Sequence, residues 1–217
     1  MKLTVILIAV VLSFLSTAAL AGNYEILYDV RNGSGWFGGD DRALSTPRDV
    51  GDGQSVLVDA DILLESFSFY FASRFDYRES PTGVGHAVTL TLDVRDDAGT
   101  ILKTVTVDLA DTFNFGWVTW TGIDLDVTAG TTLIFTAYLN GAYENHLTSS
   151  FGSDTANGYA DGSKYNKQGT GDADMALWAG WSADPTWDAT FWLQGSTPVP
   201  AEATSWGAVK ALYTGGE

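Results

Sequence analysis

The chain has 217 residues, with 11 Lys and Arg against 27 Asp and Glu and no cysteine, and its formal net charge is −16. A surface this acidic repels nucleic acid and anionic lipid, so both are excluded as partners. The absence of cysteine excludes disulfides, thiolate chemistry and cysteine-ligated zinc. The chain is long enough to bury one sizeable core without such a staple.

The first 21 residues have the composition of a secretory signal peptide. Lys2 supplies the positive start, Leu3 to Leu15 form a short apolar stretch, and Ala19-Leu20-Ala21 matches the small-residue cleavage site. A membrane-spanning helix is the alternative, but a span needs about 20 apolar residues, and hydroxyl residues interrupt this stretch. We therefore expect cleavage after Ala21 and a secreted mature chain, extracellular or at the cell surface, with no membrane span.

From residue 22 onward, period-two alternation predicts β-strands, beginning with Tyr24 to Val30. In the run 65–71, the alternation places three aromatic residues on one face: Phe67, Phe69 and Phe71. In the run 87–96, the core side receives Val88, Leu90, Leu92 and Val94. The opposite side of that strand receives Thr89, Thr91, Asp93 and Arg95.

Asp96-Asp97-Ala98-Gly99 then predicts a hairpin into a second amphipathic strand over 101–109, with Val105 and Val107 inward. Further strands are expected at 117–120, 131–139 and 189–195. Their inward residues are expected to be Leu133, Phe135, Ala137, Leu139, Phe191 and Leu193. About eight to ten short strands with one buried face each predict an all-β fold, an antiparallel two-sheet β-sandwich that is jelly-roll-like. A closed barrel is the alternative, and the pattern does not give the strand order.

Residues 22–195 form the predicted sandwich domain, and two segments in it, 32–53 and 140–188, fall outside the clear strand pattern. Long loops in compact domains often carry function, so a binding site is expected there. A further strand is expected at 175–181. Pro198 and Pro200 mark a linker over 196–204, and 205–217 is a short tail, a sorting or docking tag, with helical spacing of Trp206, Val209 and Tyr213.

Catalytic signatures are scarce. His86 and His146 are the only histidines, and neither has the neighbourhood of a catalytic triad. Asp172 and Asp174 would share a strand face if their segment were extended, and paired carboxylates are the machinery of glycosidases. The spacing is common in a chain so rich in Asp, and a turn or a metal ligand is the better interpretation. The chain is predicted not to be an enzyme.

Oxygen-bearing side chains interleaved with glycine are the ligands that Ca²⁺ prefers. Such residues gather late in the chain at Asp154, Asn157, Asp161, Asp172 and Asp174. The spacing of an EF-hand is absent. The sequence predicts no required cofactor, with a structural Ca²⁺ at these residues as the one alternative to a metal-free loop.

Aromatic residues are the second indication of a binding site, because the flat ring of Trp or Tyr presents an apolar face to a ligand while its N–H or O–H group stays polar. Five residues are the candidate ligand-binding set: Trp178, Trp181, Trp187, Trp192 and Tyr138. Trp192 lies between the inward Phe191 and Leu193, so it is expected to point away from the core. Trp120 and Tyr138 are expected to do the same. Burial in the core is the competing interpretation for each ring.

Four segments of the chain carry a resemblance to a known group of proteins: Val88-Thr89-Leu90-Thr91-Leu92-Asp93-Val94-Arg95-Asp96-Asp97-Ala98-Gly99, Asn157-Gly158-Tyr159-Ala160-Asp161-Gly162, Asp172-Ala173-Asp174-Met175 and Phe191-Trp192-Leu193. They resemble the secreted bacterial β-sandwich modules of the choice-of-anchor and PEP-CTERM-type extracellular proteins. The resemblance implies an extracellular sandwich, and it carries no catalytic residue over to this chain. The tail departs from that group, since the apolar helix and terminal Arg cluster of a PEP-CTERM signal are missing.

Three functions follow as hypotheses. The first is a secreted, non-catalytic module that binds a polysaccharide or another component of the extracellular matrix or cell surface. The second is an extracellular structural protein of a matrix or filament, which assembles through sheet edges or the tail. The third is a glycan-cleaving enzyme of sandwich fold, which requires two acids across one cleft.

Overall fold

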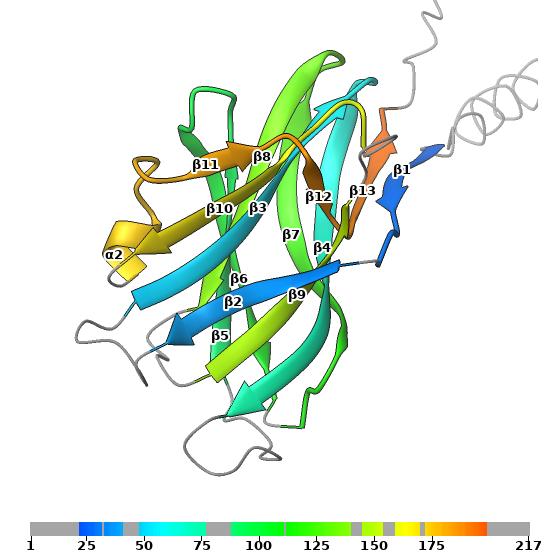
Figure 1. The fold of residues 1–217 in the computed structure, drawn as a ribbon. Helices are drawn as coiled ribbons and strands as arrows, with labels where there is room; N and C mark the ends of the chain where they lie inside the picture. Colours follow the sequence, from blue (N-terminus) through cyan, green and yellow to red (C-terminus); the bar gives the residue numbers. More distant parts are fainter. Residues whose placement is uncertain are drawn as a thin grey trace, which may run out of the picture.

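The computed structural model describes residues 22–31, 33–40, 48–76, 88–110, 112–139, 145–153, 159–169 and 172–198. The predicted signal peptide, His86, Asp154, Asn157 and the tail lie outside them. The elements in chain order (Figure 1) are β1 (Gly22–Tyr28), β2 (Gly33–Asp40), β3 (Arg48–Val58), β4 (Ile62–Asp76), β5 (Val88–Arg95), β6 (Ile101–Leu109), β7 (Gly116–Val127), β8 (Thr131–Leu139), β9 (Asn145–Ser153), β10 (Lys164–Gly169), α2 (Asp172–Met175), β11 (Ser182–Asp184), β12 (Trp187–Ala189) and β13 (Phe191–Thr197).

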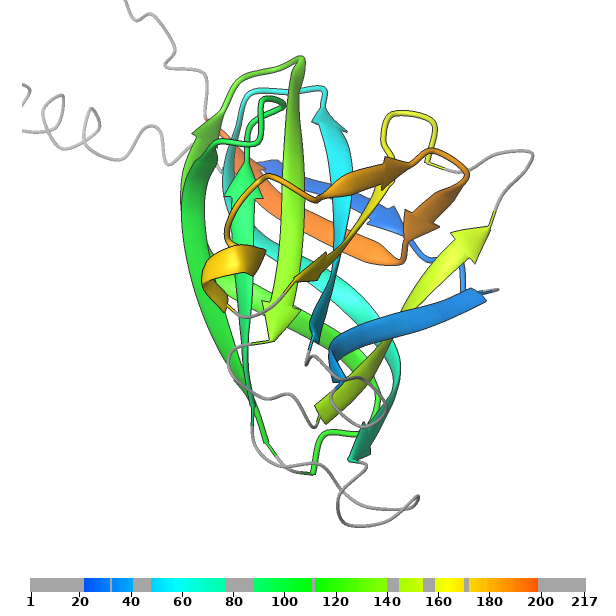
Figure 2. The same cartoon turned by 60° about the vertical axis from the view of Figure 1, so that its left-hand side comes forward.

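Two antiparallel sheets pack face to face, as predicted (Figures 1 and 2). The first sheet has the order β1-β13-β4-β7, and the second has the order β10-β3-β8-β5-β6 with β11 beside β10. Strands β9 and β2 continue the hydrogen bonding from β4 to β3, so the two sheets are joined along one side. On the other side, β6 lies beside β7.

The core lies between the sheets and follows the predicted alternation. Phe67 of β4 stacks on Phe135 of β8, with ring centroids 3.8 Å apart and planes 3° apart, so the two layers touch at their centre. The inward residues predicted on β4, β8 and β13 are all buried, as are Leu90, Leu92 and Val94 on β5. The hairpin at 96–99 is also confirmed, since Gly99 donates to the Asp96 carbonyl and adopts a φ of 85°.

The expectation that Trp120 points outward is wrong. Its ring is fully buried, and its indole N–H donates to the Leu90 carbonyl across the core at 3.2 Å. Trp117 and Trp120 are three residues apart on one strand, so they lie on opposite faces. Val118 shares the inward face with Trp120, which leaves Trp117 as the tryptophan that faces out.

The expectation of a strand at 175–181 is also wrong. One helical turn, α2, ends at Met175, and turns and bends lead from it to Trp181. This segment lies on the outer face of the second sheet rather than joining a ladder. At the C-terminal end, β13 continues to Thr197, where it pairs with Gly22, so regular structure extends two residues into the predicted linker. No helix among the described residues is long and apolar enough to cross a membrane.

Candidate functional site

The outer faces of the two sheets differ in what covers them. Residues 172–181 lie over the second sheet, across β10, β8 and β5, and we call this the covered face. The outer side of β1, β13, β4 and β7 carries Tyr70, Trp117 and Trp192, which are only partly buried, and we call it the aromatic face. The predicted ligand-binding residues are divided between these two faces.

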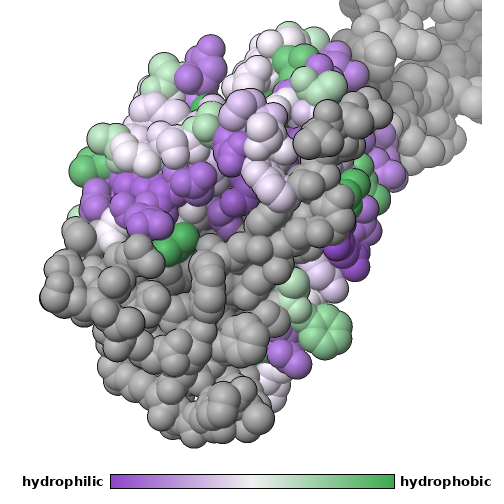
Figure 3. Space-filling view, in the orientation of Figure 1, coloured by the Kyte–Doolittle hydropathy of each residue, from purple (hydrophilic) through white to green (hydrophobic). Residues whose placement is uncertain are grey.

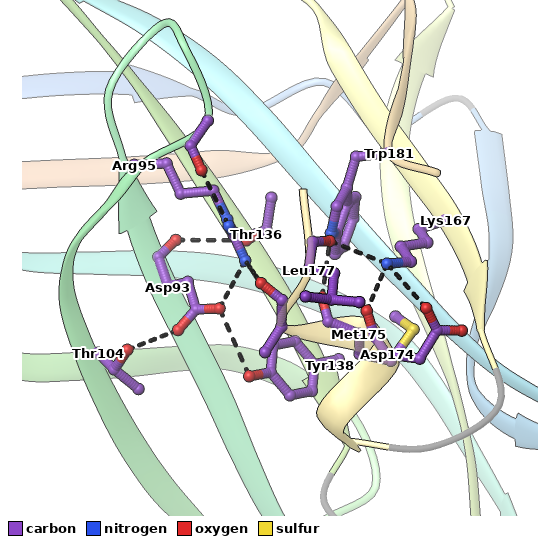
Figure 4. Close-up of polar contacts among 12 residues, drawn as sticks. Asp93, Arg95, Thr104, Thr136, Tyr138, Lys167, Asp174, Met175, Leu177 and Trp181 are labelled. Atoms are coloured by element: carbon purple, nitrogen blue, oxygen red, sulfur yellow. Dashed lines mark hydrogen bonds and ion pairs between the residues drawn. The ribbon is translucent and has the colours of Figure 1, made fainter. Parts of the chain in front are cut away.

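On the covered face, the guanidinium of Arg95 ties the segment 172–181 to the sheet (Figure 4). Arg95 is 1% exposed and donates to Asp93 Oδ2 at 2.7 Å, to Thr136 Oγ1 at 3.0 Å, and to the carbonyls of Gly99 at 3.0 Å and Ala176 at 2.7 Å. Burial lowers the pKa of Arg95, and the neighbouring Asp93 carboxylate opposes that shift. Asp93 and Arg95 do point away from the core as predicted, but a second layer removes them from solvent.

The ammonium of Lys167 makes a similar connection from β10. It donates to the Asp174 and Leu177 carbonyls, and it lies 3.4 Å from the Asp174 carboxylate. The indole of Trp181 donates to the Met175 carbonyl at 3.1 Å. Because a helix end leaves its last carbonyls without backbone partners, these bonds explain how a single helical turn is held on the sheet.

Three of the five predicted ligand-binding residues serve this packing. Trp181 is 8% exposed and Tyr138 is 5% exposed. Trp178 lies over the guanidinium of Arg95 at 5.8 Å and beside Tyr165 at 5.6 Å. A Cβ at Gly99 would lie 2.2 Å from the Trp178 ring, so only glycine fits beneath it. The surface above them is mainly hydrophilic where β10 and α2 lie (Figure 3).

The predicted calcium ligands do not converge in the described part of the chain. Asp161 is exposed in a turn, and the side chain of Asp174 faces the Lys167 ammonium. Within residues 22–198, the described positions contain no group of three His, Cys, Asp or Glu side chains suited to a metal. Asp172 lies in α2, so it does not share a strand face with Asp174.

A buried carboxylate lies inside the sandwich. Asp188 of β12 accepts from Gln54 Nε2 at 2.7 Å and from the Tyr159 backbone N–H at 2.8 Å, and it is 4% exposed. Burial raises the pKa of Asp188, and the two hydrogen bonds oppose this. Asp52, on the same strand as Gln54, pairs with Lys164 at 2.7 Å and is 2% exposed. Both acids are closed off from solvent, so neither is presented to a substrate.

The aromatic face is built by strand register. Trp192 of β13 lies opposite Leu27 of β1 and Ser68 of β4, and Tyr70 of β4 lies opposite Trp117 of β7. The Trp117 and Trp192 centroids are 6.3 Å apart, and those of Tyr70 and Trp117 are 5.5 Å apart. The three rings therefore form one continuous group across three strands.

Polar groups surround these rings. The Trp192 indole donates to Glu25 Oε2 at 3.3 Å, and the hydroxyls of Ser68 and Thr119 lie 2.9 Å apart. In the next row, Ser66 donates to Gln194 Oε1 at 3.3 Å. Ser66 and Ser68 are themselves buried, so the polar groups open to a ligand are Glu25, Thr119 and Gln194. Hydroxyl, amide and carboxylate groups beside partly exposed rings can bind a ligand that has apolar faces and many hydroxyls.

Arg31 closes one end of the aromatic face. Its guanidinium lies 3.8 Å from the Tyr70 centroid and 5.7 Å from that of Trp117. It donates to both carboxylate oxygens of Asp29, at 2.5 and 2.7 Å. The bidentate pair and the ring contact hold Tyr70 from one side, so the ring is positioned before any ligand arrives.

The sequence identified Trp192 on this face but missed Tyr70 and Trp117. Phe67, Phe69 and Phe71 point inward, so period-two alternation already places Tyr70 outward. Trp187, another predicted residue, is partly buried on the short strand β12.

No protein-family model matches the chain, and no curated protein matches it. Among solved structures, it is similar to the clostridial cysteine protease Cwp84 after propeptide cleavage, with 11% identity, a TM-score of 0.48 and coverage of 81% of this chain. It is also similar to the cysteine protease and lectin-like domains of Cwp84, a surface layer associated protein of Clostridium difficile, with 10% identity, a TM-score of 0.42 and 70% coverage. The chain spans 40% and 33% of those two chains. At these TM-scores neither likeness carries a conclusion about this protein.

Proposed function

We propose that the protein is a secreted, non-catalytic module that binds carbohydrate on the aromatic face. The observation that supports this most strongly is the group of three partly exposed rings, Tyr70, Trp117 and Trp192, on the outer side of one sheet. The apolar side of a sugar ring can lie against such a ring, while its hydroxyls reach the neighbouring polar groups.

The placement of the rings supports binding rather than simple packing. Leu27 beside Trp192 is 55% exposed, and Glu25 and Thr119 are exposed as well. An exposed group of large apolar side chains on a soluble domain marks an interaction surface. Trp181 differs in this respect, because it is 8% exposed and its indole donates to the Met175 carbonyl. Trp178 is partly exposed, as Trp192 is, but its ring packs against Arg95 and Tyr165.

The test is a glycan array followed by a binding isotherm for the full chain and its variants. Trp192→Ala should weaken binding about 30-fold, because truncating a central aromatic anchor costs about 2 kcal/mol and each 1.4 kcal/mol is tenfold in Kd. Trp117→Ala should have a similar effect. The matched control is Leu177→Ala, which removes an apolar side chain that is 58% exposed on the covered face.

Circular dichroism should show that all three variants remain folded, since each altered side chain is at least partly exposed. Glycan binding that survives both Trp192→Ala and Trp117→Ala would refute the assignment of the site. Binding to no glycan on the array would refute the proposed function itself.

A further inference from the structure

The rings of the aromatic face are not coplanar. The planes of Trp117 and Trp192 differ by 64°, and those of Tyr70 and Trp117 differ by 81°. A rigid flat surface can lie against two rings at once only when the rings share a plane. A flexible chain can present successive units at different angles, so the geometry favours a single chain over a crystalline surface.

The aromatic face is long enough that a ligand spanning it must contain several sugar units. The row Leu27, Trp192, Ser68 and Thr119 crosses β1, β13, β4 and β7. Three strand spacings cover about 14 Å, which is longer than one sugar ring. Contacts at both ends of this row are available only to an oligomer.

The charge on this sheet is acidic. Residues 22–31, 62–76, 116–127 and 191–197 contain two cations, Arg31 and Arg74, and six acids: Glu25, Asp29, Glu65, Asp76, Asp124 and Asp126. Arg31 is committed to Asp29 and Tyr70. Glu25 accepts from the Trp192 indole, so a carboxylate lies directly beside the central ring. A sugar carboxylate or sulfate placed there would meet a like charge at Glu25.

Building on the proposed function, we infer that the aromatic face takes a single, neutral glycan chain of several sugar units. Acidic glycans are rejected by Glu25 and by the net charge of the whole protein. The polar neighbours suit neutral hydroxyls, because Glu25 accepts hydrogen bonds while Gln194 and Thr119 both donate and accept them.

The test uses matched pairs of soluble glycans that differ only in charge or length. Manno-oligosaccharides and mannuronate oligosaccharides share a backbone, and each is offered from the monosaccharide to the hexasaccharide, beside cello- and chito-oligosaccharides and the crystalline forms of cellulose and chitin. We expect the bound series to be neutral and to gain affinity with length. The neutral hexasaccharide should bind at least about tenfold more tightly than its uronate counterpart at low salt, and this gap should narrow as salt screens the repulsion.

Glu25→Gln should reduce the difference in affinity between the neutral hexasaccharide and its uronate counterpart several-fold, because Gln keeps an acceptor for the Trp192 indole and removes the charge. Asp161→Asn is the control, since it makes the same change in an exposed turn outside the aromatic face. A uronate that binds as tightly as its neutral partner, and loses that binding in Trp192→Ala, would overturn this inference and leave the proposed function intact. Equal affinity for monosaccharide and hexasaccharide, or preference for a crystalline form, would also overturn it. Binding to no glycan would overturn both.

Discussion

Replacing Arg95 by methionine tests how the second layer is held on the covered face. The guanidinium is 1% exposed, and its partner Asp93 is also 1% exposed. Without the guanidinium, the Asp93 carboxylate stays buried with only hydroxyl donors, Thr104 at 2.6 Å and Tyr138 at 3.4 Å. Breaking a buried pair by removing one partner costs about 3–5 kcal/mol, so we expect Arg95→Met to lower the free energy of unfolding by about that amount.

The assay is urea unfolding followed by tryptophan fluorescence and by circular dichroism. The matched control is Arg31→Met, which breaks a second Arg–Asp pair whose side chains are 39% and 38% exposed. An exposed pair contributes about 1 kcal/mol or less. If Arg95→Met fails to fold, the double variant Asp93→Leu with Arg95→Met should recover folding, because no charge is then left buried. Equal losses for Arg95→Met and Arg31→Met would refute the reasoning.

Two further predictions concern backbone fit and pH. Gly99→Ala should destabilise the fold by about 2–4 kcal/mol, because Gly99 has a left-handed φ of 85° and a Cβ there would overpack against Trp178. The control Gly130→Ala should cost only about 1 kcal/mol, because Gly130 has a similar φ of 83° but open space around it. Equal losses of stability in the two variants would contradict the steric argument. Burial raises the pKa of Asp188, so the folded state binds the proton of the Asp188 carboxyl more tightly than the unfolded chain does. The stability that this proton contributes is fully present below the pKa of the unfolded chain, about 3.9. That stability is lost as the pH rises through the pKa of the folded state. As the pH rises from about 4, the free energy of unfolding of the wild type should therefore fall relative to that of Asp188→Asn. A difference between the two proteins that does not change with pH would show that the pKa of Asp188 is not raised in the folded state.

The core could be predicted from sequence because it depends on local alternation. Phe67, Phe69 and Phe71 repeat with the period of a strand, and so do the inward residues of β8. The prediction for Trp120 is wrong because Trp117 and Trp120, three residues apart on one strand, face opposite sides, and the two tryptophans alone do not indicate which of them faces inward. The neighbouring Val118 and Thr119 contained that information.

The covering of one sheet face could not be predicted, because it depends on contacts between distant parts of the chain. Asp93 and Arg95 read as an ordinary solvent face of β5. Their burial depends on carbonyls at 174–177 that carry no side-chain signal. A single helical turn is also too short to produce a helical period. The aromatic face was found only in part, since bringing Tyr70, Trp117 and Trp192 together requires the register of three strands, which alternation alone does not give.

The central claim is that ligand contacts the aromatic face, and the most direct measurement follows the tryptophan indoles themselves. The chain is labelled with 15N-tryptophan and titrated with the neutral oligosaccharide that binds best, and each indole signal is assigned by a single Trp→Phe variant. We predict that the Trp117 and Trp192 signals shift with the ligand while those of Trp120, Trp178 and Trp181 stay in place. Shifts at Trp178 and Trp181, with Trp117 and Trp192 unmoved, would contradict the account.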